Sequence, residues 1–393
     1  MILIGTNASG KSNVLDALDF LNRIASGKDL QTSLEAIRGG VAFASFRSNT
    51  KSGGDNFTLE VLVQGDEKIN YSYSITVKTS PRVELLQETL IRLKDRPNTK
   101  TNPYRVKLFS TDTPEEDSPS IVARLYNEKA GTKKECRRTH SILSQLQGLN
   151  LRQEITEGVE VVSKTLQGIF ILDPIPSRMR SYSPFSNVLA NDASNIAGVL
   201  AALPDPEKRI VEDKITEYVR QLPEREIRKV WAKAVGEFQT DAMLYCEEEW
   251  VENQSPMLVD SRGMSDGTLR FLGILTALLT RPTNTQIVIE EVDNGLHPSR
   301  AGLLLQILKT ISIERNIDVL ITTHNPALLD AIGPSMIPFV EVAHRDIESG
   351  ESKLTLLEDV NMLSKILASG PLGKATTEGK IEQSLSNEGN KIE

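Results

Sequence analysis

The chain has 393 residues, and its 45 Lys and Arg against 53 Asp and Glu give a formal net charge of −8. This acidic balance excludes a histone-like protein, and the presence of only two cysteines excludes a disulfide scaffold or a cysteine-rich zinc module. A hydrophobic share of 39% suffices for a packed core, and no run approaches the roughly 18 apolar residues of a membrane span, so we expect a folded cytoplasmic protein without a membrane partner.

The first predicted element is a short apolar strand, Ile2 to Ile4, that leads straight into the sequence GTNASGKS. This sequence matches the phosphate-binding pattern G-x-x-x-x-G-K-[ST], and apolar residues at helical spacing follow it, so the pattern has the strand–loop–helix context that it requires. The backbone N–H groups of such a loop bind phosphate oxygens. The predicted nucleotide-binding residues are Gly5, Thr6, Asn7, Ala8, Ser9, Gly10, Lys11 and Ser12.

Two side chains of this loop predict ATP and Mg²⁺ as the ligands. Lys11 would reach the β- and γ-phosphates and act in catalysis, and the Ser12 hydroxyl would ligate Mg²⁺. The sequence has no N-K-x-D motif, which would select guanine, so ATP is the expected nucleotide.

Beyond the first helix, alternating apolar and polar residues predict an antiparallel sheet. The runs 57–63 and 69–77 form a predicted hairpin, and 83–93 and 104–109 extend it. An acidic, polar linker at 110–120 follows.

The middle of the chain is predicted to be mostly helical. Helical patterns cover 121–167, 195–203 and 207–250, with one short strand at 169–172 between them. We therefore expect an inserted helical lid.

The C-terminal part again alternates strands and helices. A helix at 268–280, a strand at 286–290, a helix at 299–313 and a strand at 318–323 predict a right-handed parallel unit. A hairpin around 348–351 and a final helix follow.

The predicted fold class is therefore α/β, a P-loop NTPase whose two halves are separated by a lid. We expect the first half at 1–110, the helical lid at 111–256, the second half at 257–372 and a disordered tail at 373–393.

Two adjacent carboxylates end the strand QIVIEE. Neighbouring residues on a strand point to opposite faces, so Glu290 and Glu291 cannot have the same role. Glu290 would face the Mg²⁺ beside Ser12, and Glu291 would orient and deprotonate the attacking water. Paired acids at the carboxyl end of a core strand lie where such sheets bind ligands.

Two further motifs complete the candidate site. His324, in THNP at the end of the next strand, would donate to the γ-phosphate and sense its loss. The turn before the helix at 268–280 reads SDGT, in which Ser265 or Asp266 is a candidate helix cap. A helix N-terminus beside a glycine is also an anion site, and here it would serve a second subunit.

These motifs together resemble the ABC-type ATPases of the RecF/SMC/OLD class, in particular stand-alone bacterial AAA-family ATPases. The resemblance rests on GTNASGKS, SDGT, IVIEE, NGLHP at 294–298, THNP and the softer stretch NDASNIAGVLAAL at 191–203. It implies an ABC-ATPase head with an antiparallel β subdomain, and a head-to-tail homodimer that holds ATP between protomers. Ser265 and Gly267 would contact the γ-phosphate in trans.

The sequence departs from the family pattern at several positions. Glu290 stands where Asp is usual, and Asn325 where Ser is common. Family members also carry two further strands ahead of the phosphate loop, whereas four residues precede it here. Either translation starts upstream of Met1 or the sheet lacks these edge strands.

The resemblance implies an ATP hydrolase that dimerises on nucleotide and acts as a switch in DNA maintenance or repair, or in antiphage defence. A separate effector, a nuclease or a toxin, would carry out the downstream step, because no nuclease metal cluster follows His324. The alternative is a non-hydrolysing scaffold that uses ATP to restrain such a partner. DNA is a further candidate partner through the basic run KKECRR, residues 133–138, although a solvated loop is the competing interpretation.

Overall fold

The computed structural model describes residues 1–45, 54–66, 69–94, 103–126, 131–222, 227–249, 255–346 and 349–386. The chain divides into two compact units. Unit 1 joins Met1–Ser12 to Phe170–Glu393, and unit 2 is the continuous segment Asn13–Ile169. The predicted boundaries differ from these: the phosphate loop belongs with the C-terminal half, and the first antiparallel sheet belongs with part of the expected lid.

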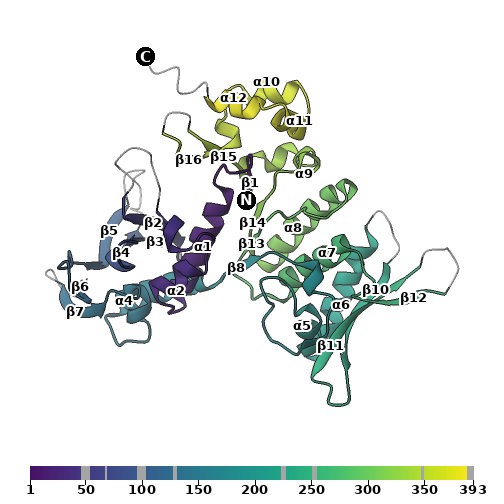
Figure 1. Cartoon of the computed structure of the whole chain (residues 1–393), viewed down its shortest axis with the longest axis horizontal. Coiled ribbons are helices and arrows are strands. Elements are labelled where there is room, and N and C mark those ends of the chain that lie inside the picture. The colour runs from purple at the N-terminus through teal and green to yellow at the C-terminus, as the bar shows by residue number, and fades with distance from the viewer. Residues whose placement is uncertain are drawn as a thin grey trace. The chain divides into compact units, whose positions relative to one another are not determined.

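The centre of unit 1 is a six-stranded sheet in the order β16-β15-β1-β14-β13-β8 (Figure 1). The strand β1 pairs in parallel with β14 and β15, and β13 pairs in parallel with β14. The edge strand β16 is antiparallel to β15. The strands are β1 (Ile2–Ile4), β8 (Ile169–Leu172), β13 (Gln286–Ile289), β14 (Asp318–Thr322), β15 (Val340–Arg345) and β16 (Ser352–Leu356).

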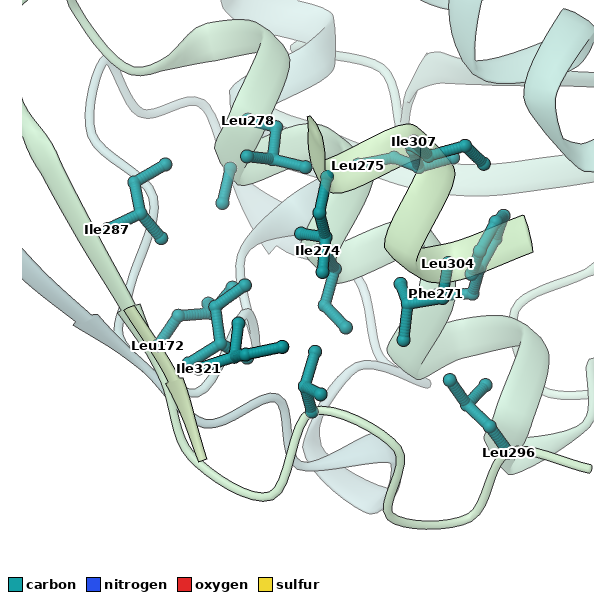
Figure 2. Close-up of a cluster of buried hydrophobic side chains, with 14 of the residues drawn as sticks. Leu172, Phe271, Ile274, Leu275, Leu278, Ile287, Leu296, Leu304, Ile307 and Ile321 are labelled. Atoms are coloured by element: carbon teal, nitrogen blue, oxygen red, sulfur yellow. The ribbon is translucent and has the colours of Figure 1, made fainter. Parts of the chain in front are cut away.

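Two helices of unit 1 contribute many of the side chains of its hydrophobic core. The helix α7 (Asp266–Thr280) is buried from Gly267 to Leu279, and α8 (Ala301–Arg315) contributes Leu304 and Ile307 to the same cluster. Figure 2 shows side chains of α7 between those of α8 and those of the sheet strands. Even so, neither α7 nor any other helix in the described ranges is long and apolar enough to cross a membrane.

The helix predicted over 207–250 is confirmed up to Arg220 as α6, and a smaller antiparallel sheet of unit 1 replaces the rest of it. The helix α6 ends at Arg220, and the chain then pairs β10 with β11 and β11 with β12. Ala, Lys and Glu suggest helix locally, but Val230, Ala232, Leu244 and Cys246 are buried on one face with the period of a strand. The elements are α5 (Ile196–Ala202), α6 (Asp205–Arg220), β9 (Ser183–Pro184), β10 (Ile227–Val235), β11 (Asp241–Glu248) and β12 (Met257–Asp260).

The segment 373–386 is helical, so the prediction of a disordered tail at 373–393 is wrong for these residues. The helices α11 (Leu372–Thr377) and α12 (Lys380–Ser386) cover most of it, and α9 (Pro326–Asp330) and α10 (Leu363–Ala368) precede it. Leu372, Ile381 and Leu385 belong to the core of unit 1, and their burial explains why this polar segment folds. The rest of the predicted tail lies outside the described residues.

Unit 2 is built on a six-stranded antiparallel meander in chain order. The predicted hairpin and its extension are confirmed as β2 to β5, but β6 and β7 form where helix was predicted. Ile121, Ala123 and Leu125 are buried in alternation on β6, as on any half-buried strand. The strands are β2 (Asn56–Gln64), β3 (Ile69–Lys78), β4 (Glu84–Lys94), β5 (Tyr104–Thr111), β6 (Ser120–Leu125) and β7 (Thr132–Arg137).

The helices of unit 2 include the continuation of the helix that follows the phosphate loop. Phe20 on this helix meets Phe57 of β2 edge to face, with ring centroids 5.5 Å apart. The helices are α1 (Lys11–Ala25), of which Lys11 and Ser12 belong to unit 1, α2 (Leu30–Glu35), α3 (Ile142–Leu146) and α4 (Gln153–Gln167). Short 3-10 turns occur at Val41–Phe43 in unit 2 and at Pro176–Arg178, Pro298–Arg300, Pro334–Phe339 and Leu357–Asp359 in unit 1.

Candidate nucleotide site

The candidate site lies in unit 1, where the carboxyl ends of three neighbouring parallel strands meet. The phosphate loop follows β1, the two acids follow β13, and His324 follows β14, which lies between the other two strands. In open parallel sheets this edge is where ligands bind. Pairing of β1 with β14 therefore joins residues that are more than 300 positions apart in the sequence.

The phosphate loop has the backbone conformation that its glycines allow. Gly5 has φ +142°, and a Cβ there would lie 2.2 Å from the Ala343 carbonyl oxygen of β15, so a side chain cannot be accommodated. The hydroxyl of Ser9 is buried and has no hydrogen-bond partner within the described part of the chain. A buried polar atom without a partner in a turn of this shape fits a loop built to receive a polar ligand.

Lys11 reaches across the loop. Its Nζ donates to the carbonyl oxygens of Gly5, at 2.7 Å, and Thr6, at 2.9 Å. Burial lowers the pKa of Lys11, and the nearby carboxylates of Glu291 and Glu290 oppose that shift. The ammonium group thus lies between the loop and the two acids, where a cation would meet phosphate oxygens.

Ser12 and Glu290 lie together as a magnesium site requires. The Ser12 hydroxyl donates to Glu290 Oε1 at 3.2 Å, although the two residues are 278 positions apart. Mg²⁺ prefers oxygen ligands at about 2.0–2.1 Å in octahedral geometry, which places neighbouring ligand atoms roughly 3 Å apart. The donor set and its spacing therefore fit Mg²⁺, and Glu290 supplies the same oxygen chemistry as the usual Asp.

The neighbouring acid has a different partner. Glu291 Oε1 lies 3.5 Å from His324 Nδ1, and the two side chains are 43% and 50% exposed. Glu291 also has φ +43°, which is uncommon for a residue with a side chain. The two adjacent carboxylates thus point to different parts of the site: Glu290 lies beside the phosphate loop and Glu291 beside His324.

The signature turn SDGT caps α7. The Ser265 hydroxyl accepts the Thr268 N–H at 3.1 Å, so of the two predicted candidates Ser265 is the cap. A Cβ at Gly267 would lie 2.7 Å from the Gly295 carbonyl oxygen, so close packing against the NGLHP segment also requires a glycine here. Arg180, for which no role was predicted, donates to the backbone carbonyls of Ser261, Arg262 and Met264 and pairs with Asp266.

Two helix caps account for other parts of the motifs. Asn325 caps α9, its side chain accepting the Ala327 N–H at 3.0 Å, and a serine could do the same, so this departure from the family pattern keeps the chemistry. His297 caps the short turn at Pro298–Arg300 through its Nδ1.

Three further residues near the site were not predicted. Arg345 Nε donates to the Ala8 carbonyl oxygen at 2.9 Å and thereby holds the phosphate loop. Thr322 and Arg270 hold the backbone of Glu291. The only sequence signal for Arg270 is a charged residue inside the apolar helix TLRFLGILTALL.

The basic run 133–138 lies in unit 2 and is only partly available to a ligand. Lys133 and Arg137 are exposed on β7, whereas Arg138 is 2% exposed and pairs with Glu84 at 3.0 Å. One of the four cations is therefore structural.

Comparisons with known proteins identify a family. Residues 1–330 match the AAA_21 model, described as "AAA domain, putative AbiEii toxin, Type IV TA system". Among solved structures, the chain is similar to the Pyrococcus furiosus Smc head domain with an extended coiled coil, bound to the C-terminal domain of ScpA. That similarity has 11% identity and a TM-score of 0.45 and covers 94% of this chain and 92% of that one. The SMC head domain from Thermotoga maritima is 12% identical, with a TM-score of 0.37 and coverage of 90% and 89%.

No curated protein matches the chain significantly. The family model nevertheless extends over every motif described above, from the phosphate loop to His324. Its span confirms the resemblance to AAA-family ATPases that the motifs predicted. The chain therefore belongs to this family of AAA ATPase domains.

Proposed function

We propose that the protein binds ATP with Mg²⁺ and hydrolyses it, and that nucleotide joins two copies head to tail. One observation carries the proposal: Lys11, the Ser12–Glu290 pair and the Glu291–His324 pair converge at one edge of the parallel sheet of unit 1. A phosphate-binding lysine, a hydroxyl–carboxylate pair for Mg²⁺, and a second carboxylate beside a histidine are the groups that ATP hydrolysis uses.

The proposed roles follow from these positions. Lys11 exchanges its bonds with the loop carbonyls for bonds with the β- and γ-phosphates. Ser12 and Glu290 would hold Mg²⁺, which offsets the phosphate charge when bound. Glu291 accepts a proton from the attacking water, and His324, 3.5 Å away, contacts the γ-phosphate and orients that carboxylate.

The proposal of a dimer is based on the position of the signature turn. Ser265 and Gly267 stand at the N-terminus of a fifteen-residue helix, where N–H groups and the helix dipole favour an anion. In the proposed dimer, these residues contact the γ-phosphate bound by the other protomer. ATP binding would bring the heads together and hydrolysis would release them.

This cycle suits a switch that acts through a separate effector, a nuclease or a toxin, in DNA maintenance or antiphage defence. The family description, which refers to a toxin of a type IV system, supports a defence setting. Exposed Lys133 and Arg137 provide a local basic surface for DNA, but the net charge of −8 argues against tight non-specific binding.

The test is phosphate release and size-exclusion chromatography of the parent and of Glu291→Gln, each with and without ATP and Mg²⁺. We expect Glu291→Gln to bind ATP, to lose turnover by roughly 100-fold or more, and to elute as a dimer only with ATP. Glu314→Gln, which changes an exposed acid of α8 that pairs with Lys214, is the matched control and should behave as the parent does.

Two outcomes would contradict the proposal. If Glu291→Gln releases phosphate as fast as the parent, Glu291 is not the base. If the parent binds ATP and dimerises but releases phosphate only at the background rate, the protein is instead an ATP-dependent scaffold.

A further inference from the structure

Arg270 is a buried cation in the middle of the apolar helix α7, five residues after the signature Ser265. It is 4% exposed, and its guanidinium leaves the helix toward the acidic turn that follows β13. Nη2 donates to the carbonyl oxygens of Glu290, at 2.8 Å, and Glu291, at 3.0 Å. A buried arginine that binds the backbone of both candidate site acids needs an explanation beyond packing.

The same guanidinium also binds two residues that follow β8. Nη1 donates to the Pro174 carbonyl oxygen at 2.7 Å, and Nη2 lies 3.2 Å from the Asp173 carboxylate. Asp173 is about half exposed, so solvent screens this ion pair. These two contacts hold the guanidinium group in a fixed position relative to the backbone that follows β8.

The backbone that Arg270 binds is in a strained conformation. Glu291 has φ +43°, a region that residues with side chains adopt only where the surroundings hold them. Its N–H donates to the Thr322 hydroxyl at 2.9 Å, while its carbonyl oxygen accepts from Arg270 and from the Asn294 N–H. Thr322 and Arg270 therefore hold the Glu291 peptide groups from opposite sides, and the direction of its carboxylate depends on both.

We propose that Arg270 is a positioning residue for hydrolysis, which holds Glu291 in the conformation that directs its carboxylate at the attacking water. Because Arg270 belongs to the helix that Ser265 caps, it also connects the signature turn to the proposed base of the same chain. When the nucleotide of the partner subunit contacts the signature turn, the contact would be transmitted through Arg270 to Glu291. The two nucleotide sites of the dimer would therefore be coupled. This inference rests on the proposed function.

Arginine suits this role better than lysine does. Its planar fork carries donors on two nitrogens, which reach the Pro174 carbonyl oxygen on one side and the Glu290 and Glu291 carbonyl oxygens on the other. The donors of a lysine come from one nitrogen and cannot span both sides. Arg270→Lys is therefore expected to restore the charge but only part of the geometry.

The experiment measures kcat, KM, nucleotide affinity and thermal midpoint for Arg270→Met and Arg270→Lys. Arg281→Met is the control, because Arg281 is a partly buried arginine just past the other end of α7 that packs 4.6 Å over the Phe170 ring. We expect Arg270→Met to lose roughly 100-fold in kcat, as displaced catalytic groups do, with nucleotide affinity nearly unchanged. Arg270→Lys should lie between this variant and the parent, and Arg281→Met should lower the thermal midpoint but keep kcat.

A second variant covers the case in which Arg270→Met does not fold. Thr322→Val removes the hydroxyl on the other side of Glu291 without unpairing a charge, and it should lower kcat with the same unchanged nucleotide affinity. If any folded variant among Arg270→Met, Arg270→Lys and Thr322→Val keeps the parent kcat, the inference is wrong. It is equally wrong if kcat and affinity fall together, as a general loss of structure would cause. Failure of the parent itself to turn over ATP would count against the proposed function instead.

Discussion

The candidate site of unit 1 and the interior of unit 2 hold charged residues in different ways. In unit 1, Glu291 and His324 are about half exposed and lie 3.5 Å apart, so they can rearrange around a ligand. In unit 2, Glu88 and Arg138 are almost completely buried, and their polar atoms bind groups of the same chain. A charged residue that is buried and fully bonded holds the fold, whereas one that is partly exposed and loosely bonded remains available for chemistry.

Lys11→Ala should have the largest effect, because it removes the ammonium group that bonds two carbonyl oxygens of the phosphate loop and would bind the nucleotide phosphates. We expect ATP binding and turnover to fall by roughly 100-fold or more, with the urea midpoint near that of the parent. Fluorescent-nucleotide titration and phosphate release measure both. Unaltered ATP affinity would mean that nucleotide binds elsewhere.

Ser265→Arg tests whether the exposed helix end of unit 1 acts on a second copy. The larger cation would fill the anion site and remove the cap of α7, so turnover should fall by about 100-fold while each protomer still binds ATP at its own phosphate loop. Mixing this variant with Lys11→Ala is the sharper measurement, since one site of the mixed dimer is intact. Recovery of turnover in the mixture supports action in trans, and full activity of Ser265→Arg alone would exclude it.

Arg138→Met should change stability and leave chemistry intact. Arg138 pairs with Glu84 at 3.0 Å and donates to the carbonyl oxygens of Leu85 and Ser118, so its loss leaves a carboxylate and buried carbonyls unpaired. We expect a loss of about 3–5 kcal/mol in the free energy of unfolding. Turnover per folded molecule should stay at the parent value.

The sequence offers a way to assign that loss to unit 2. Trp231 lies on β10 of unit 1, and the sequence of unit 2 contains no tryptophan, so tryptophan fluorescence does not report on unit 2, whereas circular dichroism follows both units. In urea, Arg138→Met should move the circular dichroism transition more than the fluorescence transition. Equal shifts would mean that the two units unfold together.

Glu88→Gln should have the smallest effect and one confined to a pH window. Burial raises the pKa of Glu88 from 4.5 to about 7, against the hydrogen bonds from the Leu143 and Ile142 N–H groups and Tyr73. Between these two values the folded state holds one more proton than the unfolded state, so the free energy of unfolding falls as pH rises from about 4.5 to about 7.

The measurement compares urea unfolding of parent and variant at pH 5 and pH 8. The parent should lose up to about 3 kcal/mol more than Glu88→Gln between these values, because the variant has no proton to exchange at this position. The same loss in both proteins would assign the pH dependence to other groups.

The sequence predicted the parts of unit 1 whose chemistry is concentrated in a few neighbouring residues. The phosphate loop and the strands β13 and β14 lie where the patterns placed them, because GTNASGKS and QIVIEE combine a local conformation with the required side chains. The positions of Ser12 and Glu290 beside each other depend on the strand order, which no local pattern contains.

Other features depended on partners that are distant in sequence. The strands β7 and β10 carry Lys, Arg and Ala, which favour helix locally, and only pairing with β6 and β11 makes them strands. Arg270 had no predicted role because its acceptors, Pro174 and the acidic turn, come from other elements. Long-range contacts overrode local preference in each case.

The strand that leads into the phosphate loop has only three residues, and both strands that pair with it come from the last quarter of the chain. During synthesis at about 5–20 residues per second, roughly 15–65 s separate Ile4 from its first partner strand. Unit 2, which is one continuous segment, is complete long before that. The ribosome therefore delivers the phosphate loop well before the strands that pair with β1, so a chain that ends before β14 exposes the loop without a nucleotide site.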